Sequence, residues 1–350
     1  MRLAKSAIGA ATAVGLAVAG LVGVASGVQA KGTPDPTDPS SLFAQVTDPN
    51  VRMQLQTTAR LDGKDTVFRI KGTVKSNVPG NAYAPKLPHG QTLFGFEGYN
   101  VRQWYRAPGT NDIYMLSREI VFYTDVKTGK VLDSWTNPLD GKTHKIVQVA
   151  NDHVNQGHMR LVDGKLYNVF GTALSPVTYR AGLKVFGREI WQAHIPPLYS
   201  LKDRYGIDDD FGLVNGTYAA WELFNTSVDT KAVKKWTNKN IQKNTMPVMI
   251  DWSRTGPTVP WMCISESTTD IHLLYNAQSW TLESFDDLEP WIKDLVNTSY
   301  PLYKAAPNEV DPTPNATTWT AFYESELKGK GAGGADLKWT NWCAISTPAA

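Results

Sequence analysis

The sequence lacks the short motifs that mark several large enzyme classes. Its 350 residues contain no G-x-S-x-G, no P-loop and no H-E-x-x-H run, so nothing indicates a nucleophile elbow, a phosphate-cradling loop or a zinc-binding helix. Histidine is also scarce, with six residues. Only His153 and His158 lie close together, and their spacing on an expected loop matches no recognised pair of metal ligands. We therefore expect neither a metal nor a cofactor.

An excess of charge of either sign is missing as well. Lys plus Arg number 35, and Asp plus Glu number 33. Arg2 and Lys5 belong to a leader without acidic residues, so the rest of the chain carries 33 of each and a formal net charge of zero. Nucleic acids and anionic membranes bind basic patches. The balance argues against both as partners.

Residues 1–30 differ in composition from the rest of the chain. Arg2 and Lys5 precede a small-apolar run that ends in Val28-Gln29-Ala30, which is the layout of a secretory signal peptide cleaved after Ala30. A membrane anchor is the alternative, but the run is poor in Leu, Ile and Phe and no charged flank follows it. Without a twin arginine or a cysteine at the cleavage point, we expect Sec-type export to the periplasm or the extracellular space.

Cysteine is nearly absent, with only Cys263 and Cys343 in the chain. In an exported protein an even pair favours a disulfide. The bond would tie the V-P-W-M-C segment to the C-terminal N-W-C segment. Two buried free thiols are the alternative.

Apolar and polar residues alternate along much of the chain after residue 50. Residues 31–50 are rich in Pro, Asp, Ser and Thr and are typical of a lead-in without an element. Residues 118–149 predict a three-strand meander, and residues 162–176 a hairpin. We predict a mainly β fold, with an antiparallel sheet that is barrel-like or strongly curved. Residues 51–350 are expected to form one domain; two lobes divided near residues 155–185 are the alternative.

Helical patterns are few and come late in the chain. Ser284, followed by acidic residues, predicts a capped helix over residues 284–296. Aromatic residues at helical spacing predict another over residues 317–327, and residues 227–236 suit a short one. We expect these helices to lie at the periphery of the sheet.

The run F-G-F-E-G-Y-N-V-R-Q-W offers the first candidate pocket. Phe94, Phe96, Asn100, Arg102 and Trp104 share a parity and therefore one face of a strand. Aromatic rings, an amide and a guanidinium on one face suit a ligand pocket. A solvent face with scattered aromatic residues is the alternative.

The next strands add candidates for which a structural role is the alternative. In S-R-E-I-V-F-Y-T-D, Arg118 shares a face with Ile120 and Phe122, whereas Tyr123 takes the other face with Glu119. Arg118 and Tyr123 are candidate binding residues, although an ion pair with a neighbouring strand would make Arg118 structural. In D-S-W-T-N-P, Trp135 and Asn137 precede a turn. Asn at such a place commonly caps the turn.

Two later strands carry the best candidates for proton transfer and charge stabilisation. Glu222 lies among apolar residues, where burial would raise the pKa of its carboxyl, and Asn225 follows it. In D-W-S-R-T-G-P-T-V-P-W-M, Asp251 takes one parity and Trp252 and Arg254 the other. An arginine beside an indole suits cation–π contact or anion capture. Trp261 after the turn either shapes the pocket or plugs the core.

Several blocks resemble a known family in their order along the chain. They are "EGYNVRQW", "REIVFYTDVKTGKVLDSWTNP", "VQVANDHVN", "DWSRTGPTVPWM" and "NATTWTAFYESEL". Together they are similar to a secreted bacterial and fungal family catalogued as a domain of unknown function, number eighteen thirty-eight. The resemblance covers roughly residues 50–330 and implies export and a single domain, with no activity to transfer. Members often carry a twin-arginine leader and a W-L-P-W block; this chain lacks the first and has T-V-P-W for the second.

Two functions fit these observations. The first is a cofactor-independent lyase, isomerase or hydrolase for a small apolar or aromatic molecule, with Glu222 or Asp251 moving protons and Arg102 and Arg254 holding negative charge. The second is a non-catalytic exported β-barrel that binds such a molecule. A carboxylate with a shifted pKa inside the cavity would favour the enzyme. An envelope structural protein without a cavity is a third interpretation.

Overall fold

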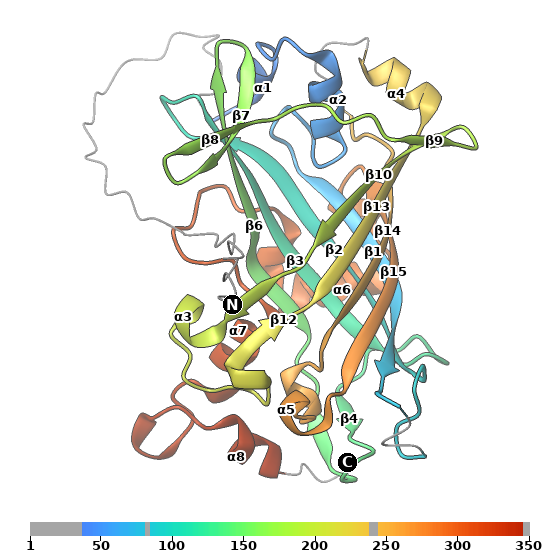
Figure 1. Ribbon diagram of the computed structural model, residues 1–350, viewed down its shortest axis with the longest axis vertical. Coiled ribbons are helices and arrows are strands. Elements are labelled where there is room, and N and C mark those ends of the chain that lie inside the picture. Colours follow the sequence, from blue (N-terminus) through green and yellow to red (C-terminus); the bar gives the residue numbers. More distant parts are fainter. Residues whose placement is uncertain (1–36, 81–84, 238–243, 346–350) are drawn as a thin grey trace, which may run out of the picture.

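One large antiparallel sheet organises the molecule. The computed structural model describes residues 37–80, 85–237 and 244–345, so the predicted signal peptide lies outside the described residues. Within these ranges eleven strands pair in the order β8-β7-β6-β3-β2-β1-β15-β14-β13-β10-β9 (Figure 1). The prediction of a mainly β, antiparallel fold is therefore confirmed. The bounds are β1 Thr66–Asn77, β2 Thr92–Arg106, β3 Asp112–Thr124, β6 Val149–Val162, β7 Lys165–Phe170, β8 Ala173–Pro176, β9 Leu183–Val185, β10 Arg188–Ile195, β13 Trp221–Asp229, β14 Met249–Pro257 and β15 His272–Leu282.

The sheet curls on itself but stays open in its strand order. Strands β8 and β9 are its two edges, and Figure 1 shows β10 and β13 passing in front of β2 and β3. Glycines inside the long strands let neighbouring backbones come close: a Cβ on Gly72 would lie 2.3 Å from the Asn276 carbonyl oxygen, and one on Gly98 would lie 2.0 Å from that of Ile120. Such glycines accompany tight strand approach and sharp bending. We call the concave face, which carries Phe96 and Tyr123, the inner face.

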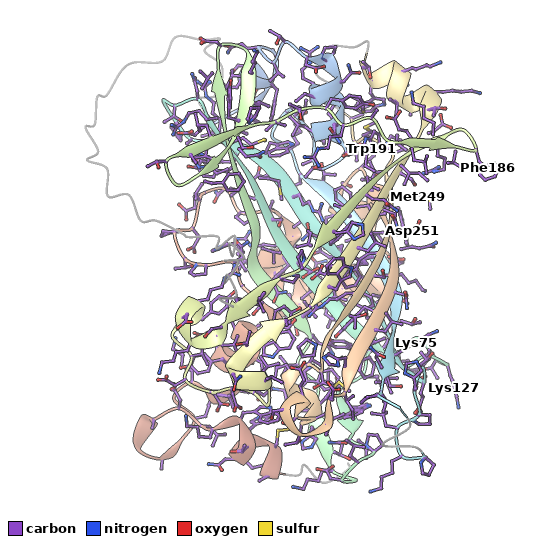
Figure 2. The ribbon with its side chains drawn as sticks, viewed as in Figure 1. Lys75, Lys127, Phe186, Trp191, Met249 and Asp251 are labelled. Atoms are coloured by element: carbon purple, nitrogen blue, oxygen red, sulfur yellow. A yellow bond between two sulfur atoms is a disulfide. The ribbon has the colours of Figure 1, made fainter. Side chains whose placement is uncertain are left out.

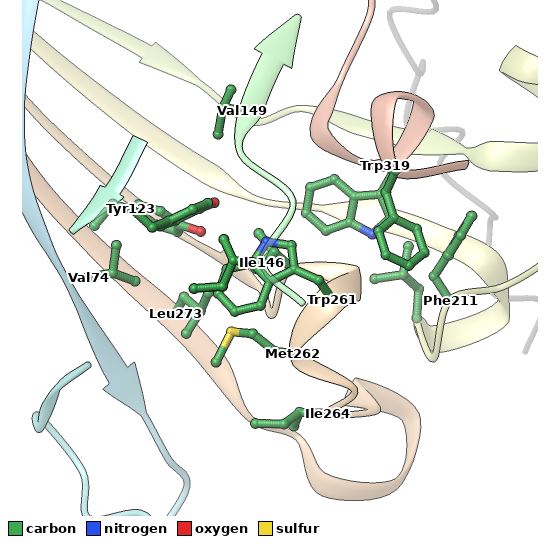
Figure 3. Close-up of a cluster of buried hydrophobic side chains, with 14 of the residues drawn as sticks. Val74, Tyr123, Ile146, Val149, Phe211, Trp261, Met262, Ile264, Leu273 and Trp319 are labelled. Atoms are coloured by element: carbon green, nitrogen blue, oxygen red, sulfur yellow. The ribbon is translucent and has the colours of Figure 1, made fainter. Parts of the chain in front are cut away.

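Hydrophobic clusters cover the inner face near both ends. The larger one gathers Phe94, Tyr123, Trp261 and Trp319 with residues from the later loops and helices, and Figure 3 shows part of it. A second cluster, around Phe68, contains residues of α2 and α4. Side chains between the clusters therefore lie deep in the molecule.

Eight α-helices in the described part of the chain surround the sheet. On the outer face, α6 packs against β2 and β3, and the buried Arg69 ties β1 to it through Glu289, 2.8 Å away, and to β2 through Glu97, 2.6 Å away. None of the described helices is long and apolar enough to cross a bilayer. The helices are α1 Ser40–Phe43, α2 Pro49–Gln56, α3 Leu201–Tyr205, α4 Thr230–Thr237, α5 Glu266–Thr269, α6 Pro290–Ser299, α7 Thr318–Phe322 and α8 Trp339–Ala344.

Three expectations about local structure need correction. Helix α1 lies within the lead-in, where the Asp38 carboxylate accepts the Ser40 backbone N–H at 2.7 Å, so helices also precede the first strand. The expected meander is interrupted, because β4 (Ser134–Thr136) and β5 (Thr143–Lys145) form a separate two-stranded sheet. The helix after Ser284 starts as a single 3-10 turn, and α6 begins only at Pro290. Strands β11 (Leu198–Ser200) and β12 (Thr217–Ala219) also pair apart from the main sheet.

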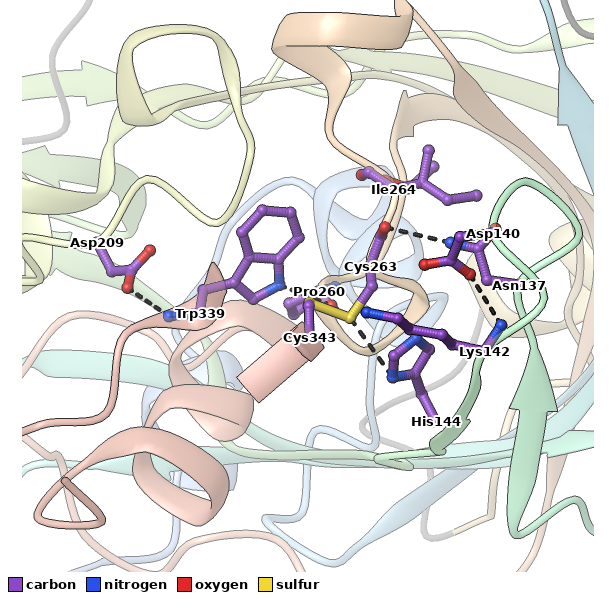
Figure 4. The surroundings of a disulfide bond; sticks show 11 residues. Asn137, Asp140, Lys142, His144, Asp209, Pro260, Cys263, Ile264, Trp339 and Cys343 are labelled. Carbon is purple, nitrogen blue, oxygen red and sulfur yellow. Dashed lines mark hydrogen bonds between the residues drawn. A yellow bond between two sulfur atoms is a disulfide. The ribbon is translucent and has the colours of Figure 1, made fainter. Parts of the chain in front are cut away.

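The disulfide between Cys263 and Cys343 is present. It joins the end of the 3-10 turn η2 (Pro260–Met262) to α8 across a sequence separation of 80 residues. The Trp339 indole N–H donates to the Pro260 carbonyl at 2.9 Å beside the bond, and Figure 4 shows this arrangement. The C-terminal helix is thus fastened to the segment that carries Trp261.

Asp65, just before β1, gives a pH-dependent prediction. Burial raises the pKa of its carboxyl to about 6, and the Ala306 N–H and Arg118 offset this only in part. The unfolded chain ionises near pH 4, so wild-type stability should fall as pH rises from 4 to 6 and stay lower above that range. Asp65→Asn should therefore be more stable than wild type by about 2 kcal/mol at pH 7.5, with no gain below pH 4. Urea unfolding at both pH values measures this, and an equal difference at both would contradict it.

Candidate functional site

Strand register places a group of charged side chains on the inner face. Asn100 on β2 is paired with Glu119 on β3, which is paired with Asn151 on β6. Directly opposed residues of antiparallel strands point to the same side, and Arg102 shares that side because it lies two residues after Asn100.

A second pair comes from the far half of the sheet. Glu222 on β13 is paired with Arg254 on β14, and Arg254 with Tyr275 on β15. Tyr275 belongs to the inner cluster, so both charged residues point inward too. The inner-face charge cluster comprises Arg102, Glu119, Glu222 and Arg254.

The curl of the sheet brings the two halves of this cluster together. Four strands separate β3 from β13, which in a flat sheet would hold Glu119 and Glu222 about 24 Å apart. Nevertheless the charges of Glu222 and Arg254 both act on the pKa of Glu119. The two halves therefore face each other across the concave side.

Arg254 sits in a cage of aromatic rings. Its guanidinium carbon is 5.2 Å from the ring centroid of Tyr275, 5.3 Å from that of Tyr218 and 6.0 Å from that of Trp319. Nη2 donates to the Tyr218 hydroxyl, and Nε lies 3.9 Å from Glu222 Oε1. Burial by itself lowers the pKa of Arg254, but the neighbouring Tyr218 and Glu222 outweigh it and raise the pKa. The cage thus holds a fixed positive charge.

Glu222 is oriented from two sides. The Trp252 indole N–H donates to Glu222 Oε2 at 3.2 Å, and Arg254 approaches the other oxygen. Trp252 also lies 5.8 Å from both Phe96 and Tyr275, measured between ring centroids. The carboxylate therefore points into an aromatic wall that spans β2, β15 and β14.

Glu119 is a carboxyl group of the cluster with altered acidity. Burial raises the pKa of Glu119, and the charge of Glu222 raises it further; the hydrogen bond from Asn151 and the charges of Arg102 and Arg254 offset this only in part. Asn151 Nδ2 donates to Glu119 Oε2 at 3.1 Å. A carboxyl group in this state can release and take up a proton at higher pH than an ordinary glutamate.

Arg102 differs from Arg254 in having no close counter-ion. Its Nε donates to Asn100 Oδ1, and its guanidinium carbon lies 4.3 Å from the Phe68 ring centroid. Among the described residues no carboxylate oxygen comes within 4.0 Å of it. Burial lowers the pKa of Arg102 to about 10, and Glu119 offsets this in part. Arg102 is therefore protonated at neutral pH and has no carboxylate counter-ion of its own.

A family model matches this region of the chain. The model is described as a protein of unknown function (DUF1838), and it covers residues 63–326. The chain belongs to the DUF1838 family. No curated protein and no solved structure matches it.

The matched range holds the whole charge cluster of this DUF1838 chain. Arg102, Glu119, Glu222, Arg254 and the Trp319 of the cage all lie between residues 63 and 326. Cys343 and α8 lie beyond it. The family match therefore includes every charged inner-face residue and leaves out one end of the disulfide.

Four candidates from the sequence pack elsewhere in the inner half. Trp261 is 0% exposed and lies 5.1 Å from Tyr123 between ring centroids, while Trp135 packs on Trp261 at 6.1 Å. Asn137 accepts from the Leu139 N–H and donates to the Cys263 carbonyl. Trp104 packs on Phe43 in the cluster beside α1. These side chains fill the core or cap a turn.

Three further candidates lie on the outer face. Asp251 is exposed and points away from the concave side (Figure 2). Arg118 forms an ion pair with Asp152 at 2.8 Å, as the structural alternative predicts. Asn225 is paired with Asp251, and both line a shallow hollow of about 430 Å³ that opens on the outside of β13, β14, β15 and β1. This hollow includes none of the charge cluster, so we do not assign the chemistry to it.

Several residues in and around the charge cluster are not among those predicted from the sequence. Glu119 shares the parity of Tyr123, and this shared strand face is the sequence feature that could have pointed to Glu119. Tyr275 and Asn151 lie in strands whose partners only the fold reveals. Tyr218 comes from β12, a strand of 3 residues that is too short to show an alternation pattern, and Trp319 comes from the helix α7. In the described part of the chain, no group of three or more His, Cys, Asp or Glu side chains is arranged to hold a metal ion.

Proposed function

We propose that this DUF1838 protein is an exported, cofactor-independent enzyme of the lyase, isomerase or hydrolase type. Its curled sheet would serve as a barrel-like container for a small, largely apolar or aromatic molecule. The disulfide is consistent with export. The inner-face charge cluster is the proposed site of reaction.

The observation that carries the proposal is the carboxyl of Glu119. A protein that only carries an apolar ligand has no need of a buried carboxyl with a raised pKa, whereas a general acid or base is favoured by one. Glu119 has that property, with Asn151 fixing its orientation. A second carboxylate and two guanidinium groups surround it.

The cluster also borders space that solvent reaches. The side chains of Arg254 and Glu222 are 15% and 19% exposed, and Arg102 and Glu119 are half-buried. Burial nevertheless dominates the pKa values of Arg102 and Glu119. Partly accessible charged side chains among aromatic rings are a typical lining of a ligand site.

Each charged residue then has a distinct role. Glu119 transfers the proton. Glu222, held by Trp252 and Arg254, stabilises positive charge or takes a second proton. Arg102 and Arg254 stabilise the negative charge that develops on the substrate. The aromatic wall of Phe96, Trp252 and Tyr275 contacts its apolar part, while Asp251 and Arg118 have no part in the reaction.

Glu119→Gln tests this proposal against Asp251→Asn. Each purified protein is incubated at low micromolar concentration with a metabolite extract of the source organism, and untargeted mass spectrometry follows the extract. We expect wild type and Asp251→Asn to consume one compound in large molar excess. Glu119→Gln should consume it at least about 100-fold more slowly, because the proton-transfer group is gone.

The pH dependence of the reaction adds a second readout. Wild type should show an inflection above the ordinary glutamate range that Glu119→Gln lacks, because the folded-state pKa of Glu119 is raised. Equal rates for Glu119→Gln and wild type would contradict the assignment of Glu119. Depletion of a compound to no more than one equivalent, with recovery on denaturation, would show a binding protein for the same kind of molecule.

A further inference from the structure

Arg102 is a guanidinium without a carboxylate partner, whereas three other arginines in the strands of the sheet have one or two. Arg69 contacts two carboxylates, and Arg118 and Arg254 each have one. A guanidinium in apolar surroundings is costly unless an anion meets it. Arg102 has an amide and an aromatic ring as its contacts, together with accessible surface on the inner face.

Buried polar atoms without partners lie at both ends of the same cluster. Asn151, 6% exposed, donates to Glu119 while its Oδ1 has no hydrogen-bond partner among the described residues. On the opposite side, Arg254 Nε and the indole nitrogen of Trp319 also lack one there. Buried polar groups in native proteins are nearly always paired, so these atoms point to a bound molecule that supplies both donors and acceptors.

The charge of the cluster limits what that molecule carries. Glu222 is the ion-pair partner of Arg254, and Glu119 accepts a hydrogen bond from Asn151. Arg102 is then the guanidinium of the cluster that has no carboxylate oxygen within 4.0 Å among the described residues. One positive charge is matched by one negative charge, so a singly charged carboxylate fits better than a phosphate ester with two charges.

We propose that Arg102 binds the carboxylate of an organic monoacid whose aromatic or rigid apolar body lies along the wall of Phe96 and Trp252. The inference rests on the proposed function, because it names the ligand class of the same site. Asn151 Oδ1 accepts from a hydroxyl or N–H of the molecule, and Trp319 donates to an oxygen. Glu119 is thereby placed between the anchored carboxylate and the rest of the ligand.

Calorimetric titration with matched probes tests this assignment. The probes are 2-naphthoate, its neutral analogue 2-naphthamide, and 2-naphthyl phosphate. We expect the wild-type protein to bind 2-naphthoate about ten-fold or more tighter than the amide, the usual worth of a charged hydrogen bond, and tighter than the phosphate ester. Arg102→Met should remove the preference over the amide, and Arg102→Lys should keep part of it.

Arg118→Met is the matched control, because it removes an arginine from the opposite face of the neighbouring strand. It should bind all three probes like wild type. Circular dichroism confirms that each variant is folded; if Arg102→Met is not, the comparison of Arg102→Lys with wild type decides. Equal binding of amide and acid, tightest binding of the phosphate ester, or no binding of 2-naphthoate would each overturn the proposal.

The result of this binding test can be distinguished from the result of the turnover test on Glu119→Gln. If Glu119→Gln stops turnover while the probes show no preference for the acid, the enzyme stands and the carboxylate anchor is wrong. If the acid preference depends on Arg102 while no compound turns over, the site binds organic acids without reaction.

Discussion

Replacing Trp261 by alanine should lower the free energy of unfolding by about 4 kcal/mol, the usual range for a fully buried tryptophan. Its indole is 0% exposed and contacts rings from three directions: Tyr123 at 5.1 Å, Phe94 at 5.6 Å and Trp135 at 6.1 Å between centroids. The surrounding rings belong to different strands and to the β4–β5 hairpin. They cannot all shift inward, so a cavity remains.

Urea unfolding followed by circular dichroism measures this loss. Trp221→Ala is the matched control, because Trp221 is 54% exposed and has His194 as its ring contact. We expect it to change the unfolding free energy by less than about 1 kcal/mol. Similar losses for the two variants would show that Trp261 does not hold the core together.

Removal of the disulfide should have a comparable effect. The double variant Cys263→Ser with Cys343→Ser frees a loop of 80 residues in the unfolded chain, which corresponds to about 4 kcal/mol of stability in the chain-entropy model. Helix α8 would then be held by Trp339, whose backbone N–H donates to Asp209 and whose indole N–H donates to Pro260, and by Trp342 against Phe322. We expect α8 to detach before the sheet unfolds.

Unfolding with and without dithiothreitol provides the measurement. Wild type should lose stability on reduction, and the double serine variant should be insensitive to the reductant. Limited proteolysis should cut near α8 in the reduced protein first, since the disulfide is the covalent tie between this helix and the η2 segment. A wild-type unfolding curve that does not change on reduction would contradict the prediction.

Much of the inner face could be predicted from the alternation of side chains along the strands alone. The parity of residues in β2 groups Phe94, Phe96, Asn100 and Arg102 on one side, and register confirms that grouping. The same reasoning separates Trp252 and Arg254 from Asp251. Period two is a property of the extended backbone, so it holds wherever a strand forms.

Alternation could not say which of the two faces is the concave one. Glu222 and Asp251 are both carboxylates next to aromatic residues, and both were candidate acids. The curl of the sheet separates the two in space, because it turns Glu222 toward Trp252 and leaves Asp251 in solvent. The same curvature leaves Arg118 on the outer face, where it forms an ion pair, and turns Glu119 to the inner face.

By itself, then, the sequence determined the strand-rich fold, which residues of a strand share a face, the cysteine pair and the family blocks. These depend on local periodicity and composition. The tertiary structure alone decided that Glu119 meets Glu222 across four strands, that Tyr218 and Trp319 enclose Arg254, and that Arg102 stays unpaired. Those contacts join residues far apart in the chain, and their distances depend on how strongly the sheet curls, which no short stretch of sequence specifies.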